Sequence, residues 1–179
     1  MVFLIDVSMT IITVSICVFC LVRLFRFALY STTPFGFRGK LYYIDDQNKR
    51  GYAFYNRSLR IGATPDMVYE TSPNKLHVVE KKSRQYGIFE SDFVQAEMGA
   101  IALSENSSKR VSHVTVSNAN QTVTRRVPNA KRLLRKRKDV IGMARRIANG
   151  EVIEIRKPEP RKCKACRYYD ECKDIVGGL

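Results

Sequence analysis

The chain has 179 residues and a formal net charge of +14 at neutral pH, with 31 lysines and arginines, five cysteines and two histidines. This length allows one domain of ordinary size, and no internal repeat or low-complexity linker is visible. The basic charge favours phosphate-bearing partners, with anionic lipid headgroups as the alternative. Neither histidine has a partner motif for a serine or cysteine nucleophile, so a hydrolase of that kind is not supported.

The first segment is almost uninterruptedly apolar from Val2 to Val22, with Asp6 as its one charged residue. About 20 apolar residues span a bilayer as a helix, so residues 1–30 are predicted to be a transmembrane anchor with a basic juxtamembrane segment. A buried helix of a soluble protein is the alternative. The positive-inside rule then predicts a single-pass protein of the cell membrane with residues 31–179 as a cytoplasmic catalytic domain. The basic residues that follow the apolar run are Arg23, Arg26, Arg38 and Lys40.

Two β-hairpins are predicted next. Residues 41–44 and 52–55 flank a polar turn and are expected to pair with each other. Residues 66–69 and 76–82 flank the turn at 71–74, which would fold the second run back on the first. Because side chains alternate along a strand, Glu80 and Lys82 would share one face while Lys81 points away. Asp66 would then reach the same edge as Glu80.

This hairpin sets two carboxylates and an amine together. Close carboxylates repel each other unless a cation lies between them, and Mg²⁺ or Mn²⁺ prefers such oxygen ligands. A bound metal would polarise a phosphoryl oxygen and activate water, while Lys82 would orient that water and offset negative charge. Charged residues near turns are usually solvated, but the turn at 62–66 before the E-x-K pattern favours the functional interpretation.

The second half of the chain alternates helices with strands. A helix over residues 93–103, capped by Ser91, would place Gln95 beside its apolar face. Residues 113–116 and 122–127 are predicted to form another hairpin. Asn129 is predicted to cap a long helix that ends at Gly150. The order of elements indicates an α/β fold.

The start of this last helix is strongly basic, which suits contact with a DNA backbone. A solvated helix face is the usual alternative for such a run. The cations are Lys131, Arg132, Arg135, Lys136, Arg137 and Lys138.

Three cysteines lie close together near the end of the chain, at Cys163, Cys166 and Cys172. In a reducing compartment such spacing favours a metal or iron–sulfur centre over disulfides. Three thiolates leave the fourth ligand position to another residue or to a partner. An iron–sulfur cluster is favoured, with zinc second.

These motifs resemble a known family. Pro65-Asp66 followed by Glu80-Lys81-Lys82 is similar to the PD-(D/E)XK nuclease signature, and Gln95 resembles the glutamine of its RecB-type branch. The cysteine cluster within residues 160–175 resembles that of the CRISPR-associated Cas-four-type exonucleases. The resemblance spans residues 39–172.

The resemblance implies a restriction-endonuclease-like α/β core, a mixed β-sheet flanked by helices, here preceded by one transmembrane helix. It implies that Asp66, Glu80 and the Lys81 backbone carbonyl hold Mg²⁺ or Mn²⁺, that Lys82 is the catalytic lysine, and that Gln95 supports the site. The implied substrate is DNA with free ends or single strands, and the implied activity is that of an end-processing exonuclease.

Three features of the chain depart from the family pattern. The RecB-type branch usually has an upstream histidine ligand, whereas His77 and His113 both follow Asp66, and Gly99 stands where a tyrosine usually follows the glutamine. The fourth cysteine of the cluster usually comes from the amino-terminal half, where Cys17 and Cys20 are the candidates. A catalytically weak, membrane-tethered DNA-binding module of the same fold is therefore the main alternative. A tethered metal or redox protein built around the cysteines is a third.

Overall fold

The structure is a computed structural model that describes residues 2–45, 53–153 and 169–172. The chain divides into two compact units, residues 1–137 and 138–179. The first unit contains the sheet and the predicted nuclease residues. The second contains the helices α4 (Lys138–Ala148) and α6 (Tyr169–Cys172).

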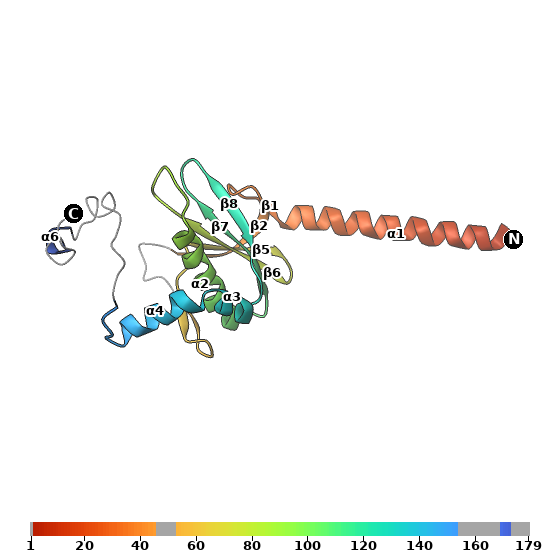
Figure 1. Ribbon diagram of the computed structural model, residues 1–179. Helices are drawn as coiled ribbons and strands as arrows, with labels where there is room; N and C mark the ends of the chain where they lie inside the picture. The colour runs from red at the N-terminus through yellow and green to blue at the C-terminus, as the bar shows by residue number, and fades with distance from the viewer. Residues whose placement is uncertain (1, 46–52, 154–168, 173–179) are drawn as a thin grey trace. The chain divides into compact units, whose positions relative to one another are not determined.

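A mixed, curled six-stranded sheet forms the centre of the first unit, in the order β1-β2-β5-β6-β7-β8 (Figure 1). All neighbouring strands are antiparallel except β6 and β7, which are parallel. The strands are β1 (Ser31–Thr32), β2 (Arg38–Ile44), β5 (Met67–Ser72), β6 (Lys75–Lys81), β7 (Arg110–Ser117) and β8 (Thr122–Arg126).

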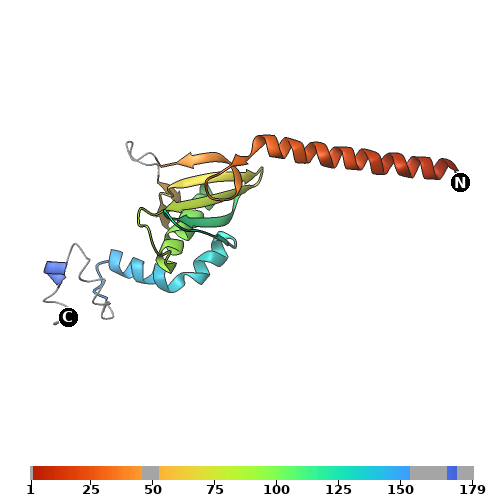
Figure 2. The same cartoon turned by 90° about the horizontal axis from the view of Figure 1, so that it is seen from above.

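The helix α2 (Glu90–Asn106) joins the two parallel strands and lies against one face of the sheet (Figure 1, Figure 2). Parallel neighbours cannot be joined by a tight turn, so the chain needs a crossover of this kind. Small side chains let the helix come close to the strands. A Cβ added at Gly99 would lie 3.4 Å from the Pro65 Cβ and 3.6 Å from the Val78 Cγ1.

The core lies between α2 and the central strands. Four consecutive residues of β6, Leu76 to Val79, are buried, as expected for a strand covered on both faces. Each fully buried valine or leucine contributes about 1.5–3 kcal/mol relative to exposure. Other fully buried apolar residues are Val68, Phe93, Ile101, Leu103, Val114 and Val116.

The prediction of a hairpin between residues 41–44 and 52–55 is wrong. Residues 41–44 belong to β2, which pairs with β5, whereas β3 (Phe54–Asn56) pairs with β4 (Ile61–Ala63). The β3–β4 turn is tightened by Arg60, which has a φ of 51°. The buried Asn56 amide donates to the Ile101 carbonyl at 3.1 Å and to the Ser104 hydroxyl at 3.0 Å, so it holds this hairpin on α2.

The other two hairpins are confirmed. The strands β5 and β6 pair around the turn at residues 73–74, and β7 pairs with β8 from His113↔Arg126 to Ser117↔Thr122. The helix predicted over 93–103 is also present, although α2 begins at Glu90 instead of after Ser91. The Asp92 carboxylate accepts the Phe89 N–H at 2.8 Å and so replaces the predicted serine cap.

The long helix predicted from Asn129 to Gly150 is interrupted. Its cap is confirmed, since the Asn129 side chain accepts the Arg132 N–H at 2.9 Å, and Gly150 has the positive φ of a helix end, 82°. The first part is α3 (Ala130–Lys136), and Arg137 separates it from α4. Arg137 is held by carboxylates of α2, so tertiary ion pairs decide where α3 stops.

The predicted transmembrane helix is not supported. Although α1 (Val2–Leu29) is a single helix, no helix within the described residues is long and apolar enough to cross a membrane. Asp6 and several hydroxyl residues interrupt the apolar run from Val2 to Val22 that the prediction relied on, and Arg23 and Arg26 follow it within the same helix. This finding overturns the transmembrane part of the predicted fold class and the single-pass cell-membrane location that rested on it.

A buried ion-pair network joins α2 to α3. The Glu97 carboxylate, 1% exposed, contacts the Arg137 guanidinium and lies 3.0 Å from the Lys136 ammonium. Arg137 also reaches the Glu90 carboxylate at 2.5 Å. Removing one partner of a buried pair leaves the other charge uncompensated.

We expect Arg137→Met to lower the free energy of unfolding by about 3 kcal/mol, because Glu97 stays buried without its main partner. Urea denaturation at neutral pH measures this loss. Arg135→Met is the matched control on the same helix, since Arg135 is exposed and should change stability by about 0.5 kcal/mol or less. The double variant Glu97→Leu/Arg137→Met should recover most of the loss. Equal stabilities for the two single variants would contradict the structural role of Arg137.

Candidate active site

The structure brings Asp66 and Glu80 to the same edge of the sheet. The pairing of Met67 with Val79 and of Val68 with Val78 sets a register whose next step places Asp66 opposite Glu80. Asp66 is fixed by the main chain on two sides. Its Oδ2 accepts the Lys81 N–H at 2.6 Å, and its carbonyl accepts the Asp45 N–H at 2.8 Å. The predicted neighbourhood of the two carboxylates is therefore present.

Lys82 lies at the centre of this group of residues. Its Nζ is 2.8 Å from the Glu80 Oε1 and donates to the Gln95 Oε1 at 2.6 Å. Its backbone N–H donates to the Ser117 carbonyl at 2.7 Å, which extends the β6–β7 pairing by one residue. The four residues predicted to be catalytic thus come together from different elements: Asp66 precedes β5, Glu80 lies in β6, Lys82 follows β6, and Gln95 lies in α2. Lys81 is exposed beside them.

The environment of Glu80 disfavours its negative charge. The residue is 2% exposed, and burial raises the pKa of its carboxyl group above the ordinary value of 4.5. The hydrogen bond from Lys82 opposes this shift, whereas the negative charges of Asp66 and Asp92 add to it. A buried carboxylate beside two others is stabilised in its charged form by a nearby cation.

The sequence interpretation missed Asp92. This carboxylate is 5% exposed, forms an ion pair with Arg84 and contributes to the field at Glu80. Arg84 also donates to the Gly87 carbonyl at 2.9 Å, so it holds the loop between β6 and α2. Gly87 has a φ of +77°, which favours glycine in this loop. An acidic residue in the first turn of a helix is usually interpreted as a helix-capping group, which concealed the position of Asp92 beside the site.

The two histidines lie elsewhere on the sheet. His77 pairs with His113 across β6 and β7, stacks on Phe37 with ring centroids 3.9 Å apart, and its Nε2 lies 2.6 Å from the Thr115 hydroxyl. Burial, and then the charge of His113, lowers the pKa of His77 to about 4. His77 is therefore a neutral part of the packing at physiological pH. Gly99, which stands where a tyrosine is usual in the family, faces Pro65 and Val78, and a Cβ added there would be in van der Waals contact with both.

The predicted DNA-binding run is divided between different roles. Lys136 and Arg137 are engaged by Glu97, whereas no described carboxylate pairs with the exposed side chains of Lys131, Arg132 and Arg135. Lys138 begins the second unit.

The cysteine centre remains a prediction. Cys163 and Cys166 lie outside the described residues, and Cys172 is placed only as the last residue of α6. Cys17 and Cys20, the candidates for the fourth ligand, are exposed on α1.

No protein-family description matches the sequence, and no curated protein is significantly similar to it.

The donor set at the site suits a hard divalent cation. In the part of the chain that the structure describes, no cluster of three or more histidine, cysteine, aspartate or glutamate side chains is arranged to hold a metal. Asp66 and Glu80 offer two carboxylates, and Mg²⁺ is commonly bound by one or two carboxylates with water and substrate phosphate completing its shell. The pKa of Glu80 is raised mainly by burial and further by the charges of Asp66 and Asp92, and a bound cation would favour its charged form.

We expect Glu80→Gln to raise the melting temperature by a few degrees at pH 7 in EDTA. Because the pKa of Glu80 is raised, the folded state binds its proton more tightly than the unfolded state, so stability falls as the pH rises above 4.5. Glutamine cannot ionise, and its carbonyl can still accept from Lys82. The gain should vanish below pH 4.5, which calorimetry across pH would detect.

Added Mn²⁺ should raise the melting temperature of the wild type and leave that of Glu80→Gln unchanged. Glu105→Gln on α2 is the matched control, because Glu105 is exposed and only accepts from Ser58. A wild type that is more stable than Glu80→Gln at pH 7 without metal would refute the assigned burial cost.

Proposed function

We propose that this protein is a metal-dependent nuclease of the PD-(D/E)XK type that hydrolyses phosphodiester bonds in DNA. The observation that carries the proposal is the convergence of Asp66, Glu80, Lys82 and Gln95, with the Lys82 ammonium within 2.8 Å of both Glu80 and Gln95. A carboxylate pair beside a fixed ammonium suits the cleavage of a phosphate ester. The carboxylates would hold the metal ion, and the ammonium would offset negative charge on the phosphate.

Each side chain has a distinct task. Asp66 and Glu80 would hold Mg²⁺ or Mn²⁺ together with the Lys81 backbone carbonyl. When bound, such a cation would supply Lewis-acid polarisation of a phosphoryl oxygen and an activated water. Lys82 orients that water and offsets the charge that develops on the phosphate, and Gln95 keeps the ammonium in place through the 2.6 Å hydrogen bond.

The substrate follows from the charge of the chain and from the family resemblance. The net charge of +14 favours a polyanion, and Lys131, Arg132 and Arg135 are exposed for contact with a DNA backbone. The motif resemblance favours an end-processing exonuclease acting on free or single-stranded ends.

A DNA-binding module with little catalysis is the second candidate. The Lys82 ammonium is held by two acceptors at once, and the carboxylates Asp66 and Glu80 offer fewer ligands than a histidine-completed site. The carboxylates would then keep the loop in place while the basic surface binds DNA.

Degradation of end-labelled single- and double-stranded DNA by the full chain in Mn²⁺ tests the proposal. We expect Asp66→Ala and Lys82→Ala to lower the cleavage rate roughly 100-fold or more. The first variant removes a ligand of the metal ion, and the second removes the ammonium that offsets charge on the reacting phosphate. Gln95→Ala should lower it less, since it only frees Lys82. Lys81→Ala is the matched control, because its exposed side chain is adjacent in sequence and outside the site.

The label identifies the attacked end. If the wild type binds DNA but does not cut it, and Asp66→Ala and Lys82→Ala bind equally well, the second candidate replaces the nuclease. If Lys81→Ala is as inactive as Lys82→Ala while both remain folded, the assigned role of Lys82 is wrong.

A further inference from the structure

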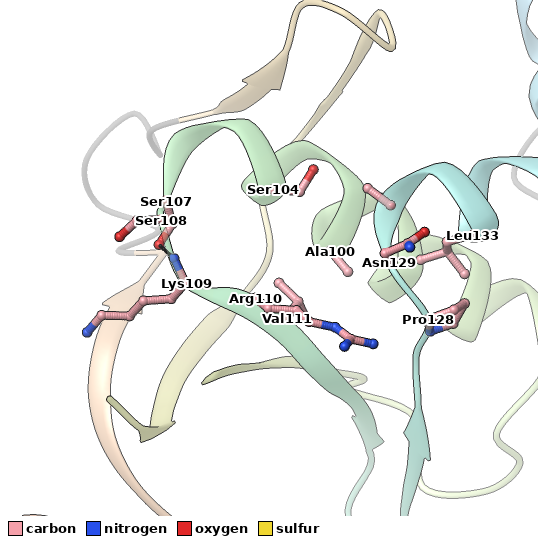
Figure 3. Close-up of a pocket in the computed structure, with 11 residues that line it drawn as sticks. Ala100, Ser104, Ser107, Ser108, Lys109, Arg110, Val111, Pro128, Asn129 and Leu133 are labelled. Atoms are coloured by element: carbon pink, nitrogen blue, oxygen red, sulfur yellow. Dashed lines mark hydrogen bonds between the residues drawn. The ribbon is translucent and has the colours of Figure 1, made fainter. Parts of the chain in front are cut away.

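Two clefts adjoin at the end of the β6–β7 pair that is opposite to Glu80 and Lys82. The parallel register pairs Lys75 with Arg110 at this end and Lys81 with Ser117 at the catalytic end. The first cleft, here called the serine cleft, has a volume of about 230 Å³ and is lined by Ser104, Ser107 and Ser108 among others (Figure 3). The second, here called the arginine cleft, has a volume of about 320 Å³ and is lined by Arg110, Arg126 and Arg132. Both clefts share Arg110, Pro128 and Asn129.

Backbone hydrogen bonds set the position of each arginine. Arg110 starts β7, and its N–H donates to the Asn74 carbonyl at 3.0 Å. Arg126 ends β8 opposite His113, and the following N–H, of Val127, donates to the Ser112 carbonyl at 2.9 Å. Arg132 lies in the first turn of α3, where its N–H is bound by the Asn129 side chain. Three separate elements therefore present guanidinium groups to one cleft.

These arginines differ from their neighbours in having no carboxylate partner within the described residues. Lys109 is 2.5 Å from Glu70, and Arg125 is 2.6 Å from Glu90. No acidic side chain of the described chain lines either cleft. The positive charge of Arg126 also reaches His113, where it adds to burial in lowering the pKa of the imidazole. The local field is thus positive and uncompensated.

The linings offer hydrogen-bond donors beside apolar surface. The hydroxyls of Ser107 and Ser108 and the guanidinium groups can donate to phosphate oxygens, whereas the Ser104 hydroxyl donates to the Ile101 carbonyl. Arginine is suited to bidentate contact with phosphate. Ala100, Val111 and Leu133 form an apolar wall of the serine cleft. Figure 3 shows Arg110 on the side of the serine cleft that Pro128 and Asn129 border. The donors suit the phosphates of a nucleic acid strand, and the apolar wall suits its sugars and bases.

We propose that the two clefts form a second DNA-binding site that grips the phosphodiester backbone away from the reacting bond. This inference rests on the proposed function and names how that site holds its substrate. The catalytic group and the clefts lie along the same helix, since Gln95 contacts Lys82 whereas Ala100 and Ser104 line the serine cleft.

The length of β6 sets the length of DNA required. The six residue steps from Lys75 to Lys81 cover about 20 Å at about 3.3 Å per step. One DNA strand advances about 3.4 Å per base, so about six base pairs span the two sites. A duplex shorter than this cannot occupy both of them.

Fluorescence anisotropy of the full chain with a labelled duplex of twelve base pairs in EDTA tests the inference without cleavage. We expect Arg110→Gln/Arg126→Gln/Arg132→Gln to weaken binding roughly tenfold or more. The slope of log K against log salt should fall by about three, one for each lost phosphate contact. Arg57→Gln is the matched control, since Arg57 is an exposed arginine outside both clefts and should leave affinity and slope unchanged.

Each single variant should lower the slope by about one, which keeps the test available if the triple variant unfolds. A triple variant that folds and binds with the same slope as Arg57→Gln overturns the inference, as does a wild type without affinity for DNA. Duplexes of four base pairs cannot reach both sites, so the wild type should bind them much more weakly than the duplex of twelve base pairs, and equal affinities for the two lengths overturn the bridging geometry.

The two proposals can fail separately. If Asp66→Ala abolishes cutting while the triple variant keeps the wild-type slope, the clefts are refuted and the nuclease is retained. If the slope falls as expected while the wild type never cuts DNA in Mn²⁺, the clefts are supported and the nuclease is refuted.

Discussion

The parallel pairing of β6 with β7 is the constraint on which the rest of the structure depends. A parallel pair cannot be closed by a short turn, so α2 must cross the sheet between the two strands. This crossover buries Leu76 to Val79 and brings Gln95 to the carboxyl end of β6. The same crossover returns the chain to Arg110 at the other end. The crossover between β6 and β7 therefore places Gln95 beside Lys82 at one end of the strands and Arg110 in the arginine cleft at the other.

The buried charge at the candidate active site costs stability. Glu80 is buried next to two other carboxylates, which a core selected for stability alone would avoid. Lys82 offsets part of the charge, but it is also held by Gln95 and lies partly exposed. Perturbed carboxyl groups in such surroundings cluster at functional sites, although structural ion-pair networks perturb them as well. The network around Glu97 shows the contrast, because there each buried carboxylate oxygen meets a cation.

Local patterns predicted the parts of the fold that local forces determine. The alternation of Glu80 and Lys82 and the turn at 71–74 predicted the hairpin that brings Asp66 to Glu80, and Asn129 was recognised as a helix cap. The failures involve distant partners. The pairing of β2 with β5 instead of β3 joins segments that no local signal connects, and the end of α3 depends on ion pairs from Arg137 to α2. The apolar run from Val2 to Val22 was judged mainly by its length, although Asp6 lies within it and Arg23 directly follows it. Asp92 was missed because an acidic residue in the first turn of a helix looks like a capping group in the sequence. Its effect on the pKa of Glu80 depends on a proximity that only the fold creates.

The net charge of the chain acquires a location only through folding. The sequence has 31 lysines and arginines against 17 aspartates and glutamates, and most of its basic residues look equivalent when counted. In the fold, Glu70, Glu90, Asp92 and Glu97 are committed to particular cations. The charge of Arg137, a member of the predicted DNA-binding run, is thereby compensated by Glu97. Arg110 and Arg126 on the strands have no carboxylate partner within the described residues. The phosphates of a DNA backbone bind where positive charge has no carboxylate partner. The surface that we propose for DNA therefore lies where β7 begins and β8 ends, together with the exposed first turn of α3.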